Sequence, residues 1–151
     1  MDRLVEFLQI RVIVYDWDDP EKIKEALLKF FEGIDLKKEK INIEEVKGKG
    51  LVSSELITYT VKINKWRVIK KVLENIKKRI ENKEDILRDL EKIVDENGRL
   101  YLRFDKDYFV NTGKLMFVDH GEVFHVKITF RAFPRTRENI LKVIREFLED
   151  P

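Results

Sequence analysis

The chain is organised around the stretch from Leu100 to Leu115, which reads LYLRFDKDYFVNTGKL. Its first part alternates between apolar and polar side chains, which predicts a strand with one buried face: Leu100, Leu102 and Phe104 alternate with Tyr101 and Arg103. The second part is rich in Asp, Asn and Gly and carries Lys106 and Lys114, which predicts a loop before the next apolar run. Two interpretations of this basic turn stay open: an ordinary connection between strands, or a rim that grips an anion.

On either side of this stretch, further apolar runs predict more strands, at about residues 5–15, 41–46, 56–63, 115–118 and 124–130. Apolar side chains at helical spacing predict four helices, each preceded by a residue able to cap it. The capping residues are Asp19, Asn64, Asn82 and Thr136. The order of these segments predicts an α+β fold, a mostly antiparallel sheet with helices packed on one face, as a single domain over residues 1–151.

The composition narrows the class of protein. The chain is 43% hydrophobic and 40% charged, yet its formal net charge is only +2. Dense, balanced charge with no cysteine and a single glutamine is typical of a thermophile protein. The absence of cysteine excludes disulfides and thiolate chemistry. No segment approaches the ~20 apolar residues of a membrane span, and the first apolar run contains Gln9. We therefore expect a cytoplasmic protein without a membrane partner.

If helices cover one side of the sheet, strand alternation identifies the side chains on the other side. Six of them are Lys or Arg and only one is acidic. Asp and Glu avoid strands in any case. A cationic face with a few aromatic rings nevertheless suits RNA, because the cations can bind its phosphates and the rings can stack on its unpaired bases. The side chains expected there are Phe7, Gln9, Arg11, Thr58, Thr60, Lys62, Arg99, Tyr101, Arg103, Asp105, Val123, His125, Lys127, Thr129 and Arg131.

Basic residues also gather away from the strands. Lys49 lies in a glycine-rich turn, and Arg135 and Arg137 flank the start of the last helix, where unpaired N–H groups can bind phosphate. In both places a solvated turn or a capped helix is the alternative. Residues 62–79 hold eight bases and one acid, and pairing with the acidic helix over residues 84–96 explains them equally well.

Catalytic chemistry is scarce in this sequence. The run Asn111–Lys114 lacks the first glycine of a phosphate loop, and Leu115 stands where Ser or Thr should bind Mg²⁺. Asp119, His120 and His125 could hold a metal, but their spacing matches no established pattern, and an exposed turn next to a strand is the better explanation. We expect no enzyme activity, no cofactor and no metal.

Two motifs are similar to those of a known family. Residues 102–106 with 113–115, and residues 133–139, resemble an archaeal family described as predicted RNA-binding proteins or predicted exosome subunits. The resemblance covers nearly the whole chain and implies a fold like that of the ribosomal protein that binds 5S ribosomal RNA. It implies no catalytic residues. The chain departs from the family pattern at Asp107 and Tyr108, which weakens Lys106 as a contact.

The sequence thus predicts a non-catalytic RNA-binding protein that uses a basic sheet face and its rim loops. RNA-processing proteins are its expected further partners, in a role accessory to RNA processing or ribosome biogenesis. The alternative is a protein-interaction or assembly domain with a thermophile-type charged surface. The expected RNA contacts are Arg11, Lys49, Lys62, Arg103, Lys106, Lys114, Lys127, Arg131, Arg135 and Arg137.

Overall fold

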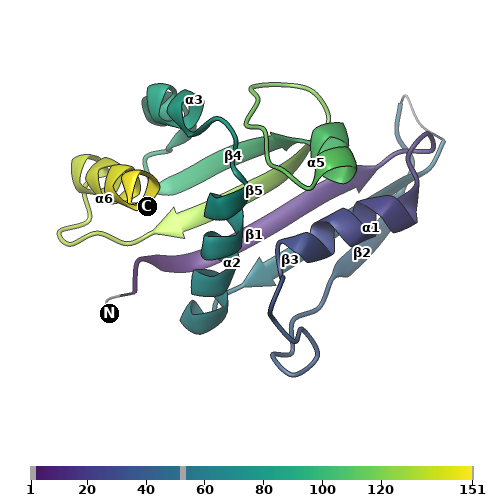
Figure 1. The fold of residues 1–151 in the computed structure, drawn as a ribbon, viewed down its shortest axis with the longest axis horizontal. Coiled ribbons are helices and arrows are strands. Elements are labelled where there is room, and N and C mark those ends of the chain that lie inside the picture. Colours follow the sequence, from purple (N-terminus) through teal and green to yellow (C-terminus); the bar gives the residue numbers. More distant parts are fainter. Residues whose placement is uncertain (1–2, 52–53, 151) are drawn as a thin grey trace.

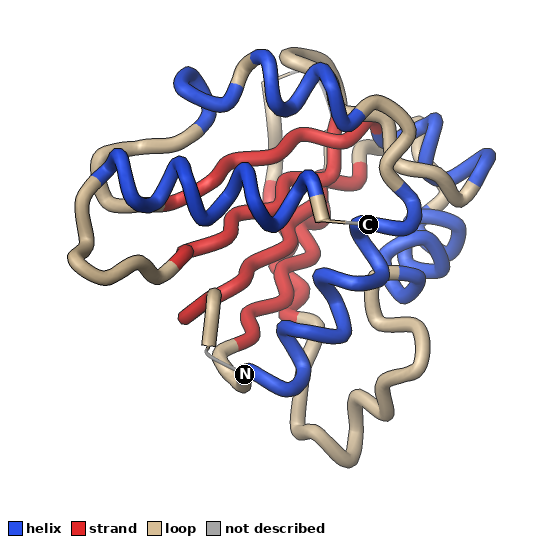
Figure 2. Tube along the Cα trace, turned by 60° about the vertical axis from the view of Figure 1, so that its left-hand side comes forward, coloured by secondary structure: helices blue, strands red, loops and turns tan. Residues whose placement is uncertain are grey.

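In the computed structural model of the protein, which describes residues 3–51 and 54–150, five antiparallel strands form one layer in the order β2-β3-β1-β5-β4 (Figures 1 and 2). The strands are β1 (Val5–Val14), β2 (Glu44–Gly48), β3 (Leu56–Ile63), β4 (Arg99–Asp105) and β5 (Val123–Phe130). The helices are α1 (Pro20–Lys29), α2 (Trp66–Arg79), α3 (Lys83–Arg88), α4 (Leu90–Ile93), α5 (Lys106–Thr112) and α6 (Arg137–Glu149). The α+β prediction is confirmed.

Two of the four predicted helix caps are confirmed. Asp19 accepts a hydrogen bond from the amide of Glu21 (3.0 Å), and Thr136 accepts one from the amide of Asn139 (3.1 Å). The prediction for Asn64 is wrong, because α2 begins one residue later, after a lysine without a side-chain cap. Asn82 is the N-cap of α3, as predicted, but its side chain makes no capping hydrogen bond. The residues that follow it form two short helices, α3 and α4, rather than one.

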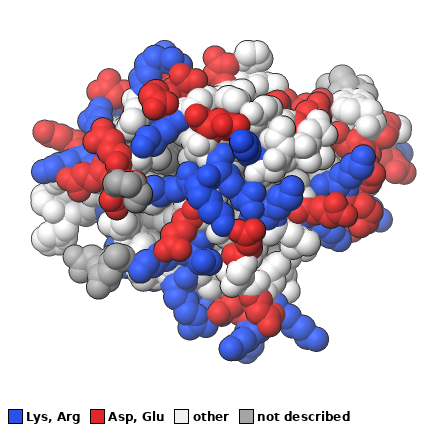
Figure 3. All heavy atoms as spheres, viewed as in Figure 1, with Lys and Arg blue, Asp and Glu red and all other residues white. Residues whose placement is uncertain are grey.

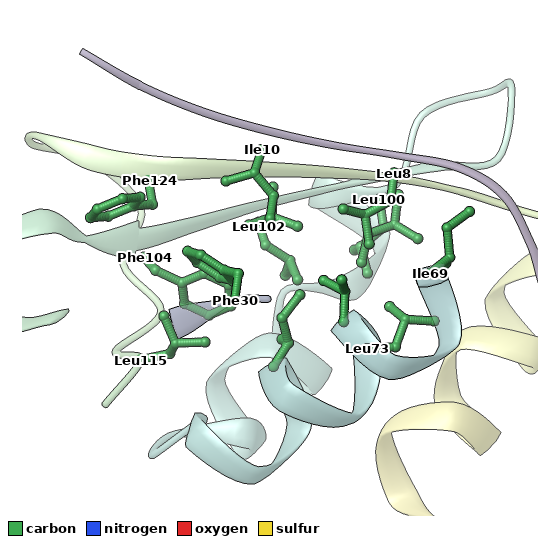
Figure 4. Packing of buried hydrophobic residues seen from close by; sticks show 14 of the residues in the cluster. Leu8, Ile10, Phe30, Ile69, Leu73, Leu100, Leu102, Phe104, Leu115 and Phe124 are labelled. Carbon is green, nitrogen blue, oxygen red and sulfur yellow. The ribbon is translucent and has the colours of Figure 1, made fainter. Parts of the chain in front are cut away.

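The hydrophobic core fills the space between the sheet and the helices. Leu8 and Ile10 of the central strand lie opposite Ile69 and Leu73 of α2, and every one of these side chains is at most 3% exposed (Figure 4). At the other end of the sheet three phenylalanine rings pack together, with centroids 5.0 to 5.8 Å apart. These rings belong to Phe30, Phe109 and Phe124. This core holds α1, α2 and α5 against one face of the sheet.

The structure corrects the prediction for the opening stretch. β4 is confirmed, but the residues after Asp105 form the helix α5 instead of a loop. This helix ends at Gly113, whose φ of +74° is the left-handed conformation that glycine adopts without strain. Residues 115–118 are not a strand either, because only isolated bridges join Leu115 to Ile80 and Phe117 to Phe104.

All helices lie on the same side of the sheet, in front of it in Figure 1. The other side, which we call the open face, is not covered by any helix of the described residues. Because strand side chains alternate, burial of Ile10, Leu102 and Val126 in the core places their strand neighbours on the open face. Within the described part of the chain, no helix is long and apolar enough to cross a membrane.

Candidate functional site

The register of the strands sets side chains of the open face into rows that run across the sheet. One row joins Arg11 of β1, His125 of β5 and Arg103 of β4, which are direct partners in the ladders. The next row, two residues along each strand, is made of the following partners: Gln9, Lys127 and Tyr101. The sequence predicted which face these side chains share, and the structure shows how closely they are grouped.

These two rows surround a shallow hollow of about 180 Å³ on the open face. We call it the cationic hollow. The side chains that line it are Gln9, Arg11, Tyr101, Arg103, His125 and Lys127, with parts of Leu102 and Val126 beneath them. Three of the six are permanently positive and none is acidic, so the hollow is built to attract an anion.

Cations at the edge of the open face differ from those in the hollow. Lys62 pairs with Glu44 (4.0 Å), Arg99 with Asp95 (3.8 Å) and Arg131 with Glu6 (3.6 Å). In contrast, the three cations of the hollow have no carboxylate oxygen within 4.0 Å among residues 3–51 and 54–150. An anion can therefore bind them without breaking an ion pair.

The pKa of His125 reports the same electrostatic environment. Burial lowers the pKa of this histidine from its ordinary 6.5, and the neighbouring guanidinium groups of Arg11 and Arg103 lower it further. At neutral pH the imidazole is therefore uncharged. An uncharged ring between two arginines leaves those two as the charged groups of its row.

Tyr101 is the aromatic residue of the hollow, and the residue is 39% exposed. Its hydroxyl donates to Asp95 (3.0 Å), which also accepts from the amides of Asn97 and Arg99 (2.9 Å each). Burial raises the pKa of Tyr101, as does the carboxylate that it contacts. The ring is thus held from its hydroxyl end while one part of it remains open to solvent.

Lys106 corrects one of the predicted contacts. Its side chain is buried, and its Nζ donates to Asp18 and Glu122 (2.5 Å each) and to the carbonyl of Ile13 (3.2 Å). The same Nζ lies 4.9 Å from the centroid of the Tyr15 ring. The sequence suggested an exposed rim residue, but this lysine joins the start of α5 to the end of β1 and cannot reach a ligand.

Other predicted contacts lie away from the hollow. Lys114 is next to the end of α2, 3.9 Å from Glu81, and Lys49 is exposed beyond the edge strand β2. Arg135 donates to the carbonyl oxygens of Phe130 (2.8 Å) and Asn97, and the guanidinium of Arg137 donates to the carbonyl oxygen of Glu91 (2.6 Å). Arg135 therefore ties the segment before α6 to the end of β5, and Arg137 ties the start of α6 to α4.

The basic stretch over residues 62–79 is largely neutralised on the helix side of the molecule. Lys65 and Arg67 pair with Glu39, while Lys78 and Arg79 pair with Glu32. Both acids precede β2 in the chain, so the partners are not in the acidic helix that the sequence suggested. In Figure 3 Lys and Arg atoms lie among Asp and Glu atoms over this side.

The two histidines do not form a metal site in the described residues. His120 contacts Asp119 in an exposed turn, whereas His125 lies on the open face between two arginines. Among the described side chains no group of three or more His, Asp or Glu is placed to hold a metal ion.

Comparison with known proteins gives consistent matches. The model of a family described as RNA binding matches residues 8–130. The RNA-binding protein PAB1135 of Pyrococcus abyssi is 31% identical over 144 residues, which cover 94% of this chain and 92% of that protein. Two solved DUF54 structures are each 27% identical. AF2318 of Archaeoglobus fulgidus has a TM-score of 0.80 and covers 95% of this chain and 99% of its own. Mth689 of Methanothermobacter thermautotrophicus has a TM-score of 0.78 and covers 97% and 99%.

Proposed function

Because this chain belongs to the RNA-binding family whose model spans residues 8–130, we propose that it binds RNA, without catalysis, through the open face of its sheet. One observation carries the choice of surface. Among the described residues the cations of the cationic hollow have no carboxylate oxygen within 4.0 Å, while those at the edge of the open face and most of those on α2 do. A phosphate that binds in the hollow gains charge-assisted hydrogen bonds and displaces no acid.

The proposed mechanism of binding is electrostatic. Arg11, Arg103 and Lys127 neutralise backbone phosphates, and counterions leave the RNA as they do so. Lys62 and Arg131 extend this surface as weaker contacts, because each must first give up its acidic partner. Phosphate contacts position RNA without reading its sequence, so this part of the surface gives little base specificity.

The biological role that we propose is accessory. RNA-processing or ribosome-assembly proteins would act on an RNA that this chain holds, and the chain itself would transfer no group. The family description and the name of the Pyrococcus abyssi relative support RNA binding. The expectation of protein partners follows from the proposed accessory role. A pull-down with this chain tests it: a protein partner should still be recovered after nuclease treatment.

A triple variant, Arg11→Gln, Arg103→Gln and Lys127→Gln, tests the proposed surface. Binding of a fluorescein-labelled single-stranded RNA is followed by anisotropy at several salt concentrations. Each phosphate neutralised contributes roughly −0.7 to the slope of log K against log salt, so the loss of three contacts should reduce the steepness of that slope by about 2. The affinity at low salt should fall as well.

The matched control removes the same number of charges from the helix side. Lys22, Lys142 and Arg145 are exposed on α1 and α6 and have no ion pair within the described residues. Their triple replacement by Gln should leave both the affinity and the salt slope close to those of the unmodified chain. Equal losses in the two triple variants, or no RNA binding by the unmodified protein at micromolar concentration, would refute the proposed surface.

A further inference from the structure

The two rows of the cationic hollow carry different chemistry. The row of Arg11, His125 and Arg103 is charged at its ends, and the next row ends in the ring of Tyr101. Two residues along a strand separate the rows by about 6.6–6.8 Å. A phosphate-binding row thus lies next to a row that ends in an aromatic side chain.

The first row fits a single phosphate group. Arg11 and Arg103 stand on strands that are both neighbours of β5, so their backbones are about 9.4–9.8 Å apart. Arginine side chains are long enough to converge from that distance on an anion above His125. The planar guanidinium binds phosphate oxygens through two parallel hydrogen bonds. Neither arginine has a carboxylate oxygen within 4.0 Å among the described residues, and the acid that Arg103 influences, Asp119, lies in an exposed turn beyond that distance, so both are available for this contact.

The second row fits a base. Tyr101 is 39% exposed as a residue, and its hydroxyl is held by Asp95, so the ring is already oriented before a ligand arrives. A stacking platform that is held in place loses less entropy on binding. Gln9 lies in the same row beyond Lys127, and its amide offers both donors and an acceptor to the edge of a base.

We propose that the cationic hollow is a subsite for one unpaired nucleotide of single-stranded RNA. Its phosphate lies between Arg11 and Arg103, and its base stacks on Tyr101. This inference rests on the proposed RNA-binding function and adds the class of RNA. In a duplex the faces of the bases are covered by their neighbours, so a base pair cannot use Tyr101. The volume of about 180 Å³ is below the roughly 300–1,000 Å³ of a small-molecule pocket, as expected for one flat ring on an open surface.

Tyr101→Leu tests the stacking contact, and Tyr101→Phe is the matched control that keeps the ring. Stacking of one base on an aromatic side chain corresponds to roughly 5- to 150-fold in affinity. We expect Tyr101→Leu to weaken the binding of a single-stranded RNA by a factor in that range. Tyr101→Phe should weaken it less, because the ring stays and only its hydrogen bond to Asp95 is removed. The salt slope should stay unchanged in both, because no cation is removed. Binding of a duplex RNA should not respond to either variant.

A second measurement does not depend on the stability of the variants. An oligomer that lacks the bases but keeps the ribose-phosphate backbone should bind the unmodified protein more weakly than the intact oligomer, by a factor similar to that of Tyr101→Leu. The subsite is refuted if the abasic and intact oligomers bind equally well. If they do, and the triple variant of the hollow still loses affinity, RNA binding by the open face stands without base stacking. No binding of any RNA overturns both proposals.

Discussion

Replacement of Lys106 by Met should destabilise the fold strongly, because it removes the counterion of a buried carboxylate. Lys106 is 1% exposed, and its Nζ lies 2.5 Å from carboxylate oxygens of Asp18 and Glu122. The side chain of Glu122 is 44% exposed and can turn to water, but that of Asp18 is 8% exposed and would remain buried without a counterion. Removal of one partner of a buried ion pair costs about 3–5 kcal/mol.

Urea unfolding measures this cost directly, and thermal unfolding should show a melting temperature lower by roughly 6–20 °C. The control is the double variant Lys106→Met with Asp18→Asn. It removes the buried charge, while the amide oxygen can still accept the hydrogen bond from the backbone of Tyr15. We expect it to recover a large part of the loss. A single variant within about 1 kcal/mol of the unmodified chain would mean that water screens this network like an exposed ion pair.

Two further predictions concern single positions. Gly98→Ala should cost about 2–4 kcal/mol of unfolding free energy, because φ is +79° and the new Cβ would lie 2.3 Å from buried Ile140. Gly121→Ala, at φ +99° in open space, should show the smaller backbone cost alone, and equal losses would contradict the steric explanation. The pKa of His125 is lowered in the folded chain, so as the pH falls the unfolded chain binds a proton at this histidine before the folded chain does. The stability that His125 contributes is therefore present above about pH 6.5 and is lost as the pH falls through the lowered pKa. In urea unfolding, the His125→Gln variant should therefore lose less stability between pH 8 and pH 5 than the unmodified protein. Identical losses would refute the lowered pKa of His125.

Strand alternation made most of the open face predictable. The period of two residues is a local property, so it placed Arg11, Arg103 and Lys127 on the face opposite the core without knowledge of the strand order. The predicted face also contained Gln9 and Tyr101, but the sequence offered no reason to single them out. Their importance comes from the register, which sets them in one row with Lys127.

The pairing of charges was not predictable, because the partners are distant in the sequence. Asp18 lies 88 residues before Lys106, and Glu32 lies 46 residues before Lys78. In a chain with 29 acidic residues each base has many possible partners. The loop predicted after β4 failed for a related reason: Asp, Asn and Gly suggest a turn, but buried Phe109 packs into the core and stabilises α5 as a helix.

The position of β1 at the centre of the sheet has a consequence for synthesis of the chain. Its Val5 pairs with Phe130, so both edges of β1 are covered only after β5, the last strand of the sheet along the chain, has been made. Until then β1 can pair only with β3, and the hydrogen-bonding groups of its other edge are exposed to strands of other molecules. Contacts of such long sequence separation also form slowly. The segment that holds Arg11 is thus exposed to aggregation during folding and is paired on both edges afterwards.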